Sequence, residues 1–209
     1  MNRTAGQRGV VPVYARAVRV DEFWALVEAS AYPGATRSER EVFLHARLRH
    51  AARSDLLDFV QHLSATREPA NTFRLWRAAD ILMGGHCGTD SFHYLQMWLV
   101  GLGREAYSAA IADPDSLSTV PEVRRLASLA KPWQDDDYPD WESLEYVACK
   151  VGEARSDIAG DVRDLVSEER GVLLRFDPNP DDVEWLHLDS AEVARRYPRL
   201  WALFSEANR

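Results

Sequence analysis

The sequence is poor in cysteine and has no long hydrophobic run. Its two cysteines, Cys87 and Cys149, are too few for the disulfide framework of a small secreted domain. No stretch approaches the roughly 18 consecutive apolar residues of a membrane-spanning helix, and the first residues lack the apolar core of a secretion signal. These absences predict a protein that does not contact the membrane and works in a reducing compartment, the cytoplasm.

Basic residues are also few relative to acidic ones. The chain has 25 lysines and arginines and 33 aspartates and glutamates, which give a net charge of −8. Nucleic-acid binding needs a cationic face, so we do not expect a nucleic acid as partner. Residues 1–19 are an exception, since their only charges are Arg3, Arg8, Arg16 and Arg19. We interpret them as a flexible basic tail, with nucleic-acid association through these arginines as the alternative.

Apolar residues are abundant: 46% of the chain is hydrophobic, with seven residues each of Trp, Tyr and Phe. Helical periodicity recurs along residues 20–155, as in the stripe Phe23, Trp24 and Val27. Ser38-x-x-Glu41 and Thr119-x-x-Glu122 fit capping boxes, and Asp140 and Asp189 fit N-caps. We therefore predict a mainly α protein with one helical domain over 20–155.

The last part of the chain has a different pattern. The apolar segments 171–176 (GVLLRF) and 183–188 (VEWLHL) flank the turn-rich sequence DPNPDD. Two short apolar runs around such a turn are typical of a β-hairpin. We predict that residues 156–209 form a small appendage of helix, hairpin and helix.

The densest set of chemically capable side chains lies in Trp76–Arg104, where a glycine-rich polar elbow joins two apolar helices. The candidate ligand or partner surface consists of Trp76, His86, Cys87, Asp90, His93, Trp98 and Arg104.

A series of short motifs resembles the bacterial domain family of unknown function DUF4240. In order, these are Phe23-Trp24, Leu75-Trp76, the glycine-rich elbow, Asp90-x-Phe92, Trp98-Leu99, Gly103-Arg104, the run 112–117 and Glu145-Tyr146-Val147-Ala148. The resemblance covers about residues 21–155 and implies a helical intracellular domain with no established activity. Where the family pattern has Ser-Asp-Asp and Phe-Arg, this chain has Gly88-Thr89-Asp90 and Leu95-Gln96.

Two kinds of chemistry are conceivable at the elbow. His86, Cys87, Asp90 and His93 are the residue types that bind metals, but their spacing matches no recognised ligand motif. Cys87 with a nearby histidine could form a nucleophile near a helix N-terminus, although no third, orienting group is evident. We interpret Cys87 as a small buried residue and His93 as a helix-surface residue. We expect no metal or other cofactor.

A pocket that includes both Asp90 and Arg104 is excluded by length, because a straight helix places them roughly 20 Å apart. We interpret Asp90 as a helix cap and Arg104 as a partner of Asp113 or Asp115. The acidic stretches 135–145 and 177–184 fit solvated loops.

No complete catalytic motif is present, so the preferred hypothesis is a non-catalytic cytoplasmic interaction or regulatory protein. The alternative is a small-molecule-binding protein or enzyme that uses the elbow at residues 84–104.

Overall fold

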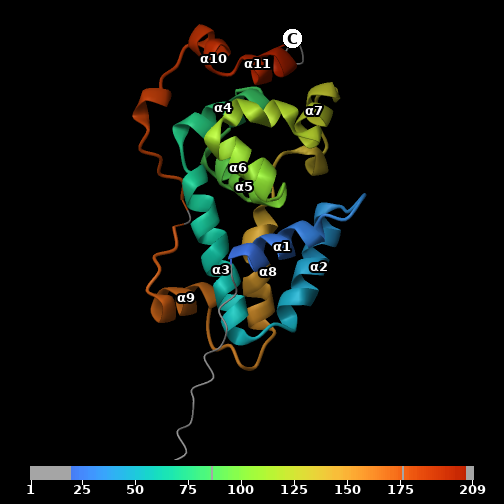
Figure 1. The fold of residues 1–209 in the computed structure, drawn as a ribbon, viewed down its shortest axis with the longest axis vertical. Coiled ribbons are helices and arrows are strands. Elements are labelled where there is room, and N and C mark those ends of the chain that lie inside the picture. Colours follow the sequence, from blue (N-terminus) through green and yellow to red (C-terminus); the bar gives the residue numbers. More distant parts are fainter. Residues whose placement is uncertain (1–19, 86, 176, 206–209) are drawn as a thin grey trace, which may run out of the picture.

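The computed structural model describes residues 20–85, 87–175 and 177–205 (Figure 1). The predicted basic tail, residues 1–19, and His86 lie outside the described residues. The described part of the chain is mainly helical, as predicted, and contains no strand. None of its helices has both the length and the apolar character needed to cross a membrane.

Three helices form the centre of the fold: α3 (Arg53–Arg67), α5 (Thr89–Gly101) and α8 (Glu142–Glu153). Each packs on the other two, and α1 (Val20–Ser30) and α2 (Arg37–Arg49) close one side. Helix α5 is buried on most of its surface, with Phe92, Leu95 and Leu99 fully enclosed. A helix that is apolar on most sides is typically central, so this prediction from the sequence is confirmed.

A second group of helices packs around a short 3-10 helix, η2 (Pro114–Thr119). It comprises α4 (Phe73–Met83), α6 (Arg104–Ala112) and α7 (Pro121–Ser128). Helix α11 (Pro198–Phe204) packs on α4, α7 and η2. The carboxylate of Asp115 in η2 accepts hydrogen bonds from the N–H of Leu200 (2.8 Å) and from Nε of Arg199 (2.8 Å). These bonds fix the start of α11.

The predicted C-terminal β-hairpin is wrong. Residues 171–175 have no regular structure, and Val183–Trp185 form the 3-10 helix η4. Leu173 and Val183, which a hairpin would pack, are 78% and 65% exposed. Figure 1 shows this segment running from α9 (Val162–Arg170), beside α3, to α10 (Ser190–Arg196) at the opposite end.

Side-chain anchors explain why no hairpin forms. The carboxylate of Asp182 accepts hydrogen bonds from the backbone N–H of Phe73 (2.6 Å) and Arg74 (2.9 Å), which are donors at the N-terminus of α4. The side chain of Asn71 accepts a bond from the N–H of Asn179 (3.1 Å). The segment is thus held along residues 71–74 by separate polar contacts and does not pair with itself.

Two predicted capping boxes are also misplaced. Helix α2 is capped by Thr36 and Glu39, two residues before the predicted Ser38 and Glu41. Helix α7 has Val120 at its N-cap with no side-chain bond, although Pro121 lies in its first turn as predicted. Of the other two predicted caps, one is confirmed and one is wrong. Asp189 caps α10 by accepting a bond from the N–H of Glu192 (2.8 Å), whereas Asp140 does not cap α8, whose N-cap is Trp141.

Candidate functional site

The elbow side chains that the structure describes do not converge on one point. The indole N–H of Trp76 donates to the carbonyl of Cys87 (2.7 Å), and its ring stacks on Phe92 with centroids 4.5 Å apart. Asp90 is exposed in the first turn of α5, which has Gly88 at its N-cap, so Asp90 is not the cap residue. Trp76 therefore fixes the shape of the elbow, while Asp90 faces solvent.

Cys87 is buried, as predicted, and its backbone N–H lies 3.3 Å from the carboxylate of Asp80. Burial and, secondarily, the charge of Asp80 raise the pKa of its thiol to about 12. A nucleophilic or metal-binding cysteine needs a lowered pKa, so this environment opposes both roles. Within residues 20–85, 87–175 and 177–205, no group of three His, Cys, Asp or Glu side chains could hold a metal ion.

The predicted pairing of Arg104 with Asp113 or Asp115 is wrong. Its guanidinium contacts the carboxylate of Asp21 (2.7 Å), and both side chains are more than half exposed. Asp113 and Asp115 are instead held by Arg199 in α11. The expectation failed because the partner of Arg104 lies 83 residues away in sequence, at the start of α1.

His93 lies in the core, 7% exposed, and not on the surface as interpreted from the sequence. Its Nδ1 is 2.7 Å from Nη1 of Arg67, and its Nε2 is 2.6 Å from Oε2 of Glu145. Because a guanidinium only donates, Nδ1 must accept and Nε2 must donate to Glu145. Both ring nitrogens are thereby used to join α3, α5 and α8, which indicates a structural role.

A surface hollow with aromatic and charged walls lies beside Trp98, at the C-terminal end of α5. This hollow, the α2–α7 groove, has a volume of about 340 Å³. It is bounded by the start of α2, the end of α5, helix α7 and the loop 129–141. Of the predicted site residues that the structure describes, only Trp98 lines it.

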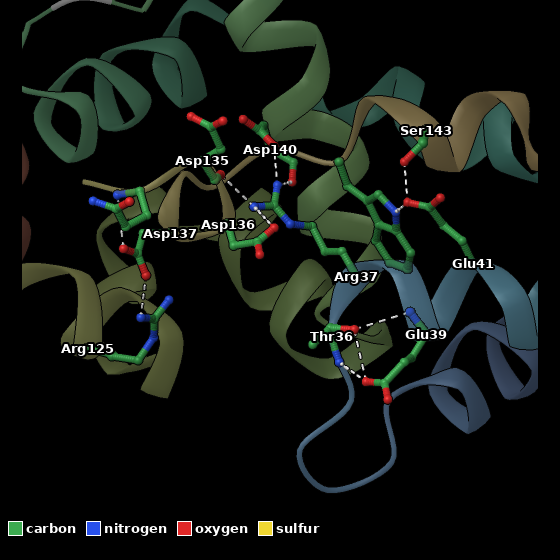
Figure 2. A network of polar contacts seen from close by, with 12 residues as sticks. Thr36, Arg37, Glu39, Glu41, Arg125, Asp135, Asp136, Asp137, Asp140 and Ser143 are labelled. Atoms are coloured by element: carbon green, nitrogen blue, oxygen red, sulfur yellow. Dashed lines mark hydrogen bonds and ion pairs between the residues drawn. The ribbon is translucent and has the colours of Figure 1, made fainter. Parts of the chain in front are cut away.

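Arg37 at the start of α2 holds the loop 129–141 in place (Figure 2). Its guanidinium is bonded to the carboxylate of Asp140, donates to the carbonyl of Asp135 (2.8 Å) and lies 3.7 Å from the carboxylate of Asp136. The next carboxylate, Asp137, is paired with Arg125 of α7 (2.7 Å). The loop predicted to be merely solvated is therefore tied to two helices.

Trp141 forms the floor of the groove and is 1% exposed. Its indole N–H donates to Glu41 of α2 (3.0 Å), and the hydroxyl of Ser143 donates to the same carboxylate (Figure 2). Arg40 covers one face of the ring with its guanidinium carbon 4.3 Å from the centroid. Arg40 also donates to the carbonyl of Gly101 (2.7 Å), so the floor joins α2, α5 and α8.

The accessible parts of the wall are aromatic and charged. Trp98 is partly buried, Tyr138 is 39% exposed, and the side chain of Arg125 is 51% exposed. Tyr138 was not predicted as a site residue because only the acids of the stretch 135–145 were considered. Arg37 and Arg125 were not predicted because they come from α2 and α7, and only the fold brings them to this loop. The signal was the alternation of aromatics with those acids, at Trp133, Tyr138 and Trp141.

Residues 18–153 match the model of the family described as "Protein of unknown function (DUF4240)". This match spans the helices that build the groove, and it confirms the resemblance carried by the sequence motifs. The chain belongs to the DUF4240 family. No curated protein and no solved structure gives a significant match to the chain.

Proposed function

We propose that this chain is a non-catalytic interaction or regulatory protein of the bacterial cytoplasm that binds a partner segment in the α2–α7 groove. The observation that carries the proposal is the composition of the wall, where Trp98, Tyr138 and Arg125 are partly accessible around a hollow. Tryptophan, tyrosine and arginine are the residue types that contribute most binding energy at protein interfaces.

The rigidity of the groove supports the same conclusion. Arg37, Arg40 and Glu41, at the start of α2, are each fixed by contacts to the loop 129–141 or to α5. Side chains that are ordered before binding lose less conformational entropy when a partner arrives. The wall is therefore preorganised for recognition.

The two thiols give no support to cysteine chemistry. Cys87 and Cys149 are both free and buried, and burial raises the pKa of Cys149 to about 11. Free thiols accord with the reducing compartment expected from the sequence. A binding role agrees better with these environments than thiol catalysis does.

Site-specific photo-crosslinking tests the proposal. Benzoylphenylalanine would replace Tyr138 in the groove or, as a matched control, Leu173, which is exposed on the irregular segment after α9. In producing cells we expect one defined protein adduct from position 138, identified by mass spectrometry and reproduced with the purified partner. The same adduct from both positions, or none from position 138, would contradict the proposal.

A second candidate function, small-molecule binding at the elbow, is supported by a hollow of about 400 Å³ between Gly84-Gly85 and helices α10 and α11. Its lining includes the ion pair of Arg77 and Asp80 (2.8 Å) from α4 and the indole of Trp201 from α11. Nε of Arg77 is buried and lacks a hydrogen-bond partner within the described part of the chain. A carboxylate with an apolar body would supply the missing acceptor after a small rotation of the guanidinium.

Thermal denaturation with a series of small aliphatic and aromatic carboxylates tests this candidate. We expect at least one to raise the Tm of the wild type and of Arg175→Leu, a control at an exposed arginine, but not that of Arg77→Leu. Equal shifts in the wild type and Arg77→Leu, or no shift with any carboxylate, would eliminate the elbow hollow as a carboxylate site.

A further inference from the structure

The α2–α7 groove continues into a hollow on each side. One, of about 400 Å³, lies between α6 and α7 and shares Leu102 and Glu122 with the groove. The other, of about 420 Å³, lies over the start of α8 and shares Arg37 and Asp136 with it. The three together form one elongated depression, a shape that suits an extended segment better than a compact ligand.

Acidic side chains outnumber basic ones along this depression. Eight carboxylates and three guanidinium groups line the three hollows. The guanidinium groups already have partners within the chain. Arg37 pairs with Asp140, and Arg125 pairs with Asp137. Arg40 donates to the backbone carbonyl of Gly101 and covers the Trp141 ring. The positive charge of these groups is therefore largely compensated by contacts within the chain.

Part of the carboxylate set faces solvent. The side chain of Asp136 is 95% exposed and lies only at the edge of the Arg37 cluster (Figure 2). Glu122, which lines both the groove and the α6–α7 hollow, and Glu105, which lines the hollow, are also exposed. An incoming segment therefore meets negative charge along the length of the depression and the aromatic surfaces of Trp98 and Tyr138 in the middle.

From this charge and shape we infer that the partner segment is extended and basic, with arginine or lysine side chains that lie in the depression. The inference rests on the proposed function and adds the chemistry of the partner. The methylene groups of such side chains would cover Trp98 and Tyr138, and their cationic ends would reach Glu122 and Asp136. An acidic segment would bring like charges together at these positions.

Fluorescence anisotropy with the full chain and three labelled 12-residue peptides tests the inference. The peptides alternate alanine with arginine, glutamine or glutamate. We expect only the arginine peptide to bind, and to bind more weakly as salt rises from 0.05 to 0.3 M. The groove variant Glu122→Gln with Asp136→Asn should bind it roughly five- to tenfold more weakly, because two rim ion pairs are lost.

A matched control separates the groove from the overall charge of −8. Asp164→Asn with Glu184→Gln changes net charge equally at exposed residues outside the three hollows, and should change the affinity less than twofold. Equal weakening in both double variants would overturn the inference, as would no binding of the arginine peptide. Binding of the glutamine or glutamate peptide that depends on the groove would overturn it while leaving the proposed function intact. Loss of the position-138 crosslink would instead refute the proposed function.

Discussion

Replacing Gly101 with alanine should destabilise the protein through the floor of the groove. Gly101 is the last residue of α5, and a Cβ there would lie 2.5 and 2.6 Å from Cε3 and Cζ3 of Trp141. Carbon atoms pack at about 3.5–4.0 Å, so the indole must move by about 1 Å. It is not free to do so, because Arg40 covers one face and Glu41 holds its N–H.

The expected magnitude follows from two opposing terms. Overpacking a well-filled core costs about 1–3 kcal/mol, whereas glycine to alanine within a helix gains about 0.5–1 kcal/mol. We expect Gly101→Ala to lower the free energy of unfolding by about 1–2 kcal/mol. For a chain of this size that corresponds to a decrease in Tm of about 2–8 °C.

Urea denaturation followed by circular dichroism measures this change. Gly88→Ala is the control, since a Cβ there meets no atom within 4 Å, and it should cost less than about 1 kcal/mol. Gly101→Ala should also cost less in a Trp141→Phe background, where the clashing part of the indole is absent. Unchanged stability of Gly101→Ala, or the same cost in both backgrounds, would refute the reasoning.

Three further predictions concern buried polar groups and thiols. Glu41→Ala leaves the indole N–H of Trp141 without its acceptor and should cost about 1–3 kcal/mol in urea denaturation, with Glu41→Gln recovering most of the loss. A similar cost for both variants would count against the hydrogen bond. Cys87 and Cys149, with thiol pKa values of about 12 and about 11, should react with Ellman's reagent at pH 8 only after unfolding, so rapid reaction in the native protein would contradict their described burial. Asp115→Ala should cost about 2–4 kcal/mol and accelerate hydrogen exchange in α11 before other helices, and uniform acceleration would show that Asp115 does not specifically anchor α11.

Sequence periodicity identified the helices well, because an apolar stripe must be buried wherever the helix packs. The stripe Phe23, Trp24 and Val27 is buried on α1, as the pattern predicted. The same local reasoning failed for the apolar segments around DPNPDD. Their conformation is set by Asp182 and the N-terminal N–H groups of α4, more than 100 residues earlier in the chain.

Side-chain roles were harder to predict for the same reason. Glu41 matched a capping box, yet its carboxylate is used by Trp141, 100 residues away. The cap that does form, from Thr36 and Glu39, has an equally ordinary local sequence. A motif shows which bonds a side chain can make, and the tertiary contacts decide which bonds it makes.

The candidate site lies at the C-terminal end of α5 and not at the predicted elbow, again because tertiary contacts decide where side chains meet. The elbow concentrates reactive residue types, but Cys87 and His93 are turned into the core and Asp90 faces solvent. Trp98, near the other end of the helix, is the predicted site residue that lines the groove. The arginines and tyrosine beside it come from α2, α7 and the loop 129–141, and their meeting depends on the fold.

Hydrogen–deuterium exchange of the full chain, with and without saturating arginine peptide, tests the central claim most directly. Protection should appear at the start of α2 and in residues 98–106, 119–126 and 135–143, the segments that contribute to the lining of the depression. Protection confined to residues 77–85 and 188–205 would place binding at the elbow hollow and contradict the account.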